Sequence, residues 1–485
     1  MGGNYEKSMY NQLMDVMARL DTVEKERRQE TTRLKEEISA LKLENQHLRE
    51  EIKLLRDDNA RLKGIMNNNS SNTSLPPSTD EKKGKPANTY NSREKTNRKA
   101  GGQKGRKGTT LTKAAVEEKI KSGNCRHEIK EIGDPSTKTY VTKYVMDLDV
   151  TAQITEIRIY ADANGHFAIP PEYRNDVIYG SNVKALAVAL YSEGVMSNDR
   201  IAAFLNAASN EGLALSEGSI YHFCKAFSAK AESNIETLET ELLNQAVVAT
   251  DATVVTVNGK QKFIRNFSIE STVVYHAMKD KKINTMQKLN FLERFSGILV
   301  HDHETALYHF GIDHAECNVH IIRYLKKNTE ETKNKWSDQM ISLLCEANRT
   351  RKVLIADGAK GFPEEAVAEY EERYEELIRR GREENLKTNH KYAKDEEKKL
   401  LNRMEKYSHN HLLFLHDLAV PFDDNMSERD LRKAKNRQKM AGGFRKDSGH
   451  EMYCTILTII ETLKRRKMGM IENIKKVFIG TPAIF

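Results

Sequence analysis

The sequence AVVATDATVVTVNGK, residues 246–260, decides the fold of this chain. Its apolar and β-branched residues predict a strand with an acid, Asp251, in its middle. Asn258-Gly259 is the dipeptide that fits a tight type I′ hairpin turn, and the alternating residues 262–269 predict the returning strand. Residues 272–277 predict a third strand, so the segment is expected to form an antiparallel meander.

Beyond the meander, the chain carries a second acid to the end of a fourth strand. A helix is expected over residues 283–295, and the apolar run 298–300 then leads to Asp302. This order predicts an α/β fold with a ribonuclease H-like core, in which the first and fourth strands lie side by side. Asp251 and Asp302 would then meet, and two facing carboxylates repel unless a hard cation such as Mg²⁺ or Mn²⁺ neutralises them. The alternative is that each aspartate is a solvated residue of a strand or a strand end.

Length and composition predict a protein of several modules. The 485 residues suggest two to four folding units, at roughly 100 to 200 residues each. The net charge of +8 is concentrated between Lys82 and Lys113, where eleven Lys or Arg stand against one acid. The sequence contains no signal peptide and no apolar run that could span a bilayer, and its five cysteines lack paired spacing. These features predict a cytoplasmic protein with free thiols.

Residues 1–66 predict a coiled-coil dimerisation segment, a leucine zipper. Leucines recur every seven residues, Ile and Asn alternate at the a positions, the g positions are acidic and the following e positions are basic. That sign pattern pairs g with e′ across a parallel homodimer, which a single solvated helix would not predict. The residues expected at the interface are Leu34, Leu41, Leu48, Leu55, Leu62, Asn45 and Asn59.

Residues 67–115 contain almost no apolar side chains and predict a disordered basic linker. Lys104, Arg106 and Lys107 lie among glycines, on a backbone that can approach a phosphate chain closely. An excess of positive charge in a segment that follows a dimerisation helix favours an arm that contacts DNA. The alternative is a soluble linker that happens to be basic.

Two modules are expected between the linker and the core. Residues 116–180 predict a small β-rich module similar to a degenerate zinc ribbon, from the alternating stretches 139–142 and 155–160. No zinc is expected there, because only Cys125 and His127 are close in sequence. Residues 181–240 predict helices whose spacing permits a helix-turn-helix DNA-binding unit, although two amphipathic helices and a glycine turn more often mean ordinary packing.

The catalytic core is expected in two parts, residues 241–330 and 411–485, interrupted by a charged helical insertion over residues 331–410. In the second part, a loop leads into a helix that begins near Asn425 and carries Glu428. Glu428 is a candidate third acid. It also lies three residues after Asn425, which is capping-box spacing, so a purely structural role is the alternative.

The run Asp424-Asn-Met-Ser-Glu428-Arg429, continued by residues 436–445, resembles the C-terminal catalytic signature of the insertion sequence 66 family of bacterial transposases. The resemblance covers nearly the whole chain, from the zipper and the basic linker to Asp302 and the Cys317-x-x-His320 pair. It implies a DDE enzyme in which Asp251, Asp302 and Glu428 are the catalytic triad and bind two Mg²⁺ or Mn²⁺ ions per active site. His320 matches a signature that follows the second Asp in many relatives, and its accessory role is left open.

The resemblance further implies a transposase that cleaves transposon ends and joins their 3′-hydroxyls to target DNA by two-metal-ion phosphoryl transfer, at the nucleoid in the bacterial cytoplasm. Its partners would be double-stranded DNA, a second copy or a higher oligomer of the chain, and accessory transposition proteins. The alternative is a non-catalytic dimeric DNA-binding protein, a domesticated relative that uses the zipper and the arm alone. The basic side chains expected to contact DNA beside the third acid are Arg429, Arg432, Lys435, Arg437, Lys439 and Arg445.

Overall fold

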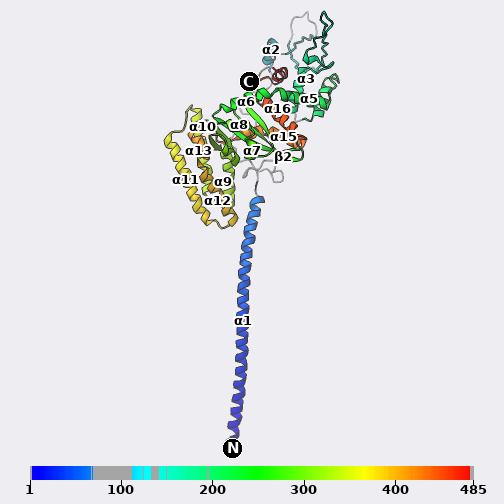
Figure 1. Ribbon diagram of the computed structural model, residues 1–485. Coiled ribbons are helices and arrows are strands. Elements are labelled where there is room, and N and C mark those ends of the chain that lie inside the picture. The colour runs from blue at the N-terminus through cyan, green and yellow to red at the C-terminus, as the bar shows by residue number, and fades with distance from the viewer. Residues whose placement is uncertain are drawn as a thin grey trace. The chain divides into compact units, whose positions relative to one another are not determined.

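The computed structural model describes residues 3–66, 68, 112–123, 125–132, 141–148, 150–193 and 196–480. They form a five-stranded mixed sheet with many helices, consistent with a ribonuclease H-like core, and a long N-terminal helix (Figure 1). Internal contacts separate two compact units: the helical unit, Met1–Thr89 with Asn318–Leu418, and the core unit, Tyr90–Cys317 with Ala419–Phe485. None of the helices in the described ranges is long and apolar enough to cross a membrane.

The sheet of the core unit follows the predicted order. Its strands are β1 (Val247–Val257), β2 (Lys260–Ser268), β3 (Val273–Met278), β4 (Ile298–His301) and β5 (Asp313–Glu316), in the spatial order β3-β2-β1-β4-β5. The first three strands are antiparallel, and β4 lies parallel beside β1. Asn258 and Gly259 have φ of 49° and 70°, the left-handed conformation that a type I′ turn requires. The predicted meander and the pairing of the first and fourth strands are confirmed, and β5 extends the sheet beyond the prediction.

Strand β3 is an edge strand whose open side is covered by helix α16 (Asp447–Arg465). The Tyr275 N–H donates to Thr458 Oγ1 at 2.9 Å, and Thr462 Oγ1 donates to the carbonyl oxygen of Val273 at 3.1 Å. Threonine hydroxyls therefore take the place of a neighbouring strand, which leaves this edge closed to pairing with another chain.

The core unit contains further helices beside α16. They are α2 (Lys113–Lys121), α3 (Ser181–Glu193), α4 (Asn198–Ala208), α5 (Glu217–Lys230), α6 (Glu232–Leu243), α7 (Ile283–Met286), α8 (Asn290–Arg294), α14 (Asn425–Asp430), α15 (Arg432–Ala441) and α17 (Met470–Ile479). Short 3₁₀ turns occupy Pro171–Tyr173 and Thr305–His309. The helix expected over residues 283–295 is thus two short helices, α7 and α8. Helices α3, α4 and α5 bury apolar faces against one another. Such packing is the alternative to the helix-turn-helix DNA-binding unit predicted for this region.

The expected β-rich module contains no strand in the parts of residues 116–180 that the structure describes. Val145 and Ile154 are 91% and 94% exposed, so no described segment covers these two side chains. A strand becomes stable when it pairs with another strand and buries one face, and alternation alone supplies neither condition. The prediction of β structure is wrong for these residues.

The helical unit contains α9 (Asn318–Thr332), α10 (Trp336–Ala356), α11 (Glu364–Lys387), α12 (Lys391–Lys406) and α13 (Ser408–His416). Its contact boundaries, Asn318–Leu418, are wider than the expected insertion over residues 331–410. At its centre, the fully buried Glu397 carboxylate accepts hydrogen bonds from polar side chains of four neighbouring segments. The donors are Asn328, Asn334, Trp336, Asn385 and Thr388.

Helix α1 (Gly3–Met66) is continuous over the predicted coiled-coil segment (Figure 1). The heptad leucines from Leu34 to Leu62 are 47% to 62% exposed in the single chain. The dimer itself stays a prediction. Lys104, Arg106 and Lys107 of the predicted basic arm lie outside the described residues.

Candidate active site

The pairing of β1 with β4 brings the first two acids together where β4 ends. The last registered pair of these parallel strands is Ala249 with Val300. Asp251 and Asp302 each follow that pair by two residues, so the two acids lie at the same height along the two chains. Both residues are half-buried. Local strand register alone therefore makes Asp251 and Asp302 neighbours.

The third predicted acid, Glu428, lies on the six-residue helix α14, which packs against β1 and β2. This helix begins at Asn425, and its N-cap residue is Asp424, whose side chain makes no capping hydrogen bond. Asn425 is thus inside the helix, and the capping-box alternative for Glu428 is contradicted, because that motif needs the N-cap side chain three residues before the glutamate.

Asp424 places a further carboxyl group beside the three predicted acids. Its side chain is 1% exposed, and its backbone N–H donates to Cys317 Sγ at 3.3 Å. Among the described residues, Asp424 Oδ1 has no hydrogen-bond partner although it is buried. A buried acceptor without a donor is costly in a folded protein, so this oxygen suits a site that takes up a cation or a proton.

The carboxyl groups act on one another electrostatically. The pKa of Asp251 is raised from 3.8 to about 6, first by burial and then by the charges of Asp302 and Glu428, against the lowering effects of the Ala252 N–H and Lys281. Burial also holds the pKa of Asp424 well above its usual range, and Asp251, Glu428 and Asp302 add to that rise. The structure therefore brings Asp251, Asp302 and Glu428 together, and Asp424 joins them.

Such an accumulation of carboxyl oxygens fits a divalent cation, since oxygen ligands and negative charge are what Mg²⁺ and Mn²⁺ require. A buried cation on the strand next to β1 is already engaged by another acid. The fully buried Arg265 on β2 lies 2.5 Å from Glu304 Oε1 through its Nη2, and its Nη1 donates to Thr250 Oγ1 at 3.0 Å. Lys281 Nζ reaches the second oxygen of Glu304 at 2.9 Å. The sequence did not predict this ionic group, because nothing in the pattern of a strand indicates that its arginine is buried.

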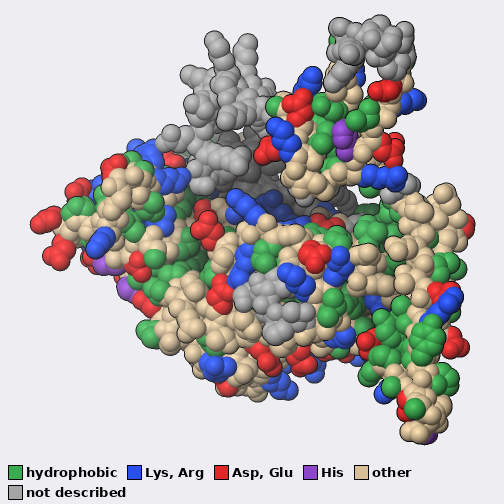
Figure 2. Space-filling view, turned by 90° about the horizontal axis from the view of Figure 1, so that it is seen from above, with side chains coloured by type: hydrophobic (Ala, Val, Ile, Leu, Met, Phe, Trp, Pro, Cys, Tyr) green, Lys and Arg blue, Asp and Glu red, His purple; other side chains and the backbone are tan. Residues whose placement is uncertain are grey.

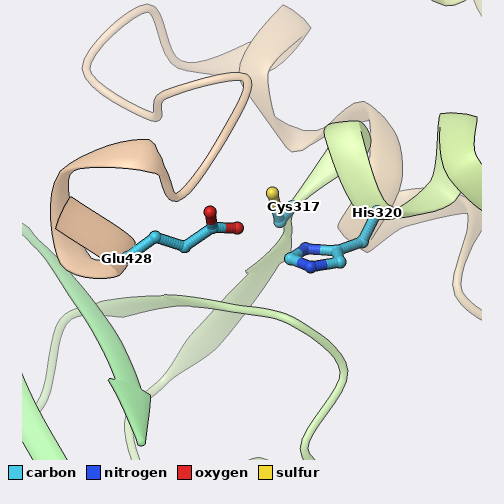
Figure 3. Close-up of side chains that lie close together, drawn as sticks. All are labelled: Cys317, His320 and Glu428. Atoms are coloured by element: carbon cyan, nitrogen blue, oxygen red, sulfur yellow. The ribbon is translucent and has the colours of Figure 1, made fainter. Parts of the chain in front are cut away.

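Cys317 lies at the end of β5 and faces the third acid. Figure 3 shows the Glu428 carboxylate directed toward Cys317, and the Cys317 Sγ and a Glu428 carboxylate oxygen lie within 4.8 Å of each other. His320, also drawn in Figure 3, lies in the first turn of α9, where its Nε2 is 3.1 Å from Nη1 of Arg323. The cysteine of the Cys-x-x-His pair thus contacts the loop and the helix that carry Asp424 and Glu428.

Most of the basic residues predicted beside the third acid are exposed. Figure 2 shows Lys and Arg side chains interspersed with Asp and Glu over the visible face of the molecule. The exposed members of the predicted set are Arg429, Arg432, Lys435, Lys439 and Arg445. Their positions leave them available to a DNA backbone.

Arg437 differs from the rest of that set. Its guanidinium carbon lies 4.4 Å from the centroid of the Tyr191 ring and 5.4 Å from that of Tyr453, and its Nη1 donates to the Tyr191 carbonyl oxygen. A guanidinium stacked on two aromatic rings contributes to packing. This placement argues against the DNA contact predicted for Arg437.

The glycines that follow α15 have a structural role. Phe444 N–H donates to the Thr256 carbonyl oxygen at 2.7 Å, and Asn258 N–H donates to the Phe444 carbonyl oxygen at 2.8 Å, which joins this loop to the end of β1. Gly443 has φ of 131°, and a Cβ there would lie 2.3 Å from the Thr256 oxygen. Only glycine permits this approach, so the segment after the third acid is anchored to the strand of the first acid.

Comparison with known families agrees with this geometry. Residues 176–452 match the family described as Transposase IS66 family, and residues 20–112 match a family of unknown function, DUF6444. A search of curated proteins found no match. The first match covers more than half of the chain and includes all four carboxyl groups of the site. Transposases of this DDE family generally are catalytic, bind DNA and typically use divalent metal ions. The chain belongs to the IS66 family of transposases, which act in DNA transposition.

Proposed function

We propose that this protein is a catalytically active transposase that binds transposon-end DNA, cleaves it and joins the 3′-hydroxyl ends to target DNA. One arrangement carries the proposal: Asp251 on β1, Asp302 directly after the paired strand β4, and Glu428 on helix α14, which packs against β1, are far apart in sequence but are brought together by the fold. They lie close enough for Asp302 and Glu428 both to raise the pKa of Asp251. Three acids gathered in this way form the kind of site that metal-dependent phosphoryl transfer needs.

In this proposal Asp251, Asp302 and Glu428 are the ligands of two Mg²⁺ or Mn²⁺ ions, and Asp424 offers a further oxygen. When bound, the ions would neutralise charge on the phosphate and lower the pKa of the attacking water or 3′-hydroxyl. The placement of Asp251 on β1 and of Asp302 directly after the paired strand β4 supports this role, because a preorganised ligand set loses little energy to rearrangement.

DNA is proposed to lie along the exposed basic side chains that follow the third acid, Arg429, Arg432, Lys435, Lys439 and Arg445. The arm residues Lys104, Arg106 and Lys107 would add contacts to phosphates at any sequence. Phosphate contacts of this kind orient a duplex on the protein but carry no sequence information. Recognition of the terminal repeats would therefore depend on other residues.

The proposed activity is tested by incubating the full chain with DNA that carries the ends of its own element, or scrambled ends, in Mg²⁺, Mn²⁺ or EDTA. We expect strand breaks at the authentic ends only when a metal ion is present, and joined products when a target plasmid is added. DNA terminated by 3′-dideoxynucleotides should still bind but should not be joined. Binding without any metal-dependent breaks would favour the alternative, a non-catalytic dimeric DNA-binding protein.

We also propose that α1 pairs with α1 of a second copy in parallel. The exchange of Lys42, Arg49 and Arg56 for Glu should weaken the dimer, because like charges would then face each other at g and e′. A second variant, with Glu37, Glu44 and Glu51 changed to Lys, should be weakened equally. An equimolar mixture of the two should restore a dimer, which sedimentation velocity would detect. A monomeric mixture would contradict the parallel register.

A further inference from the structure

We propose that Asn266 is a positioning residue that fixes strand β1, which carries Asp251, to helix α14, which carries Glu428, and thereby determines how tightly the site binds a divalent cation. This inference rests on the proposed function, because it assumes that the acids bind metal. Asn266 is fully buried on β2, directly opposite Asp251 in the sheet register.

Every hydrogen-bonding position of the Asn266 amide is used. Its Oδ1 accepts from the Asp251 N–H at 3.0 Å and from the Ser427 hydroxyl at 2.8 Å. Its Nδ2 donates to the Ser427 carbonyl oxygen at 3.0 Å and to Ser268 Oγ at 3.1 Å. An amide offers two donors and two accepting lone pairs, so this side chain is fully satisfied. One residue thus holds the backbone of the first acid and the residue next to the third acid.

The same network continues to the other side of Glu428. Ser268 Oγ donates to Asp430 Oδ2 at 2.7 Å, and Arg465 of α16 forms an ion pair with the same carboxylate. The Tyr275 hydroxyl donates to the Asp430 carbonyl oxygen at 3.2 Å. Glu428 is therefore bracketed by Ser427 and Asp430, both of which are bonded to the sheet.

Helix α14 depends on these bonds for its position. It has six residues, and helices this short are unstable alone because nucleation costs more than so few hydrogen bonds return. Its side chains at Ser427 and Asp430 meet polar groups of β2, and the Ser427 side chain is fully buried. A shift of α14 against β1 would change the spacing of Glu428 and Asp251, and metal ligands held out of place bind a cation more weakly.

The experiment measures Mn²⁺ binding by the full chain, from the free Mn²⁺ signal in electron paramagnetic resonance, together with thermal melting. The variants are Asn266→Ala, which removes the whole link, and Ser427→Ala, which removes one hydroxyl and keeps the backbone bond. Asn473→Ala is the matched control, because Asn473 is a buried asparagine on α17 whose side chain donates to the carbonyl oxygen of Gly469, the N-cap residue of the same helix. Glu428→Gln identifies the binding that belongs to this site.

We expect Asn266→Ala to weaken Mn²⁺ binding by about tenfold or more, the range found for residues that orient metal ligands. Ser427→Ala should weaken it by a smaller factor, and Asn473→Ala should leave it within about twofold of the unchanged protein. If the control variant melts at a lower temperature but binds Mn²⁺ as tightly as the unchanged protein, a general loss of stability does not explain weaker Mn²⁺ binding by Asn266→Ala. That result would support the proposal.

Unchanged Mn²⁺ affinity in folded Asn266→Ala would overturn the inference and leave the proposed function intact. If Asn266→Ala does not fold, Ser427→Ala decides the matter, and an affinity equal to that of the unchanged protein overturns the inference. Absence of Mn²⁺ binding in the unchanged protein, or binding that Glu428→Gln does not alter, would instead overturn the proposed metal site itself.

Discussion

Glu428→Gln is expected to lower strand cleavage by more than about a hundredfold. The loss of a metal ligand should reduce activity by more than the roughly 10- to 100-fold that is typical when a residue bonded to a ligand is lost. The exchange keeps the size of the side chain and one carbonyl oxygen, so the helix can remain in place. It removes one negative charge from a site in which Glu428 already acts on Asp251 and Asp424. A cation bound there would lose both a ligand and part of the charge that holds it.

Cleavage of end DNA by this variant should be measured in Mg²⁺ and in Mn²⁺, beside thermal melting and DNA binding. The matched control is Glu451→Gln, which makes the same exchange at an exposed position of α16. Both variants should melt and bind DNA like the unchanged protein. Near-normal cleavage by Glu428→Gln would move the third acid elsewhere, and the buried Asp424 would then be the first residue to change to Asn.

Glu397→Gln is expected to lower the free energy of unfolding of the helical unit by about 2–4 kcal/mol, since hydrogen bonds to a charged acceptor contribute roughly 1.5–3 kcal/mol each and do not add fully. Glu397 Oε1 accepts from Trp336 Nε1 at 2.7 Å and from Asn328 Nδ2 at 2.9 Å, and Oε2 accepts from Asn385 Nδ2 at 2.9 Å. An amide in place of the carboxylate turns an NH₂ group toward some of these donors. Buried donors then lose their acceptor, and that desolvation cost destabilises the fold.

Trp336 gives this prediction a direct readout. It is the single tryptophan of the chain, it is fully buried in the helical unit, and its indole N–H bonds to Glu397 itself. Urea unfolding followed by tryptophan fluorescence should show an earlier transition for Glu397→Gln. Asp395→Asn, an amide exchange at an exposed position two residues away on α12, should leave the midpoint within experimental error. Equal midpoints for the two variants would contradict a central role for Glu397.

Several features could be read from the sequence because they depend on neighbouring residues. Asn258-Gly259 sets a two-residue turn, and a two-residue turn fixes the register in which Asp251 lies opposite Asn266. The apolar run before Asp302 predicted a strand beside the first one, and the pairing of β1 with β4 bears this out. The seven-residue repeat of leucines predicted the long helix α1 for the same reason, since periodicity is a local property of the chain.

Other predictions concern features that depend on distant partners. The alternating stretch around Ile154 has the pattern of a strand, but no described segment pairs with it. Arg437 lies in a basic run that suggests a DNA contact, yet the Tyr191 ring, from a segment far away in sequence, lies beneath its guanidinium. Neither result could be anticipated from local pattern, because both depend on which surfaces meet after folding.

The sequence by itself thus determined the strands of the meander and the register of the hairpin, which follow from short-range turn geometry and strand periodicity. It placed Asp251 beside Asp302 through the strand order of a ribonuclease H-like core. Only the tertiary structure decided that α14 carries Glu428 to Asp251, that Asp424 is buried beside both, and that Asn266 bonds to Ser427 across 161 residues of chain. The physical reason is that burial, pKa and hydrogen-bond partners are properties of the packed neighbourhood of a residue, and that neighbourhood comes mostly from residues far away in sequence.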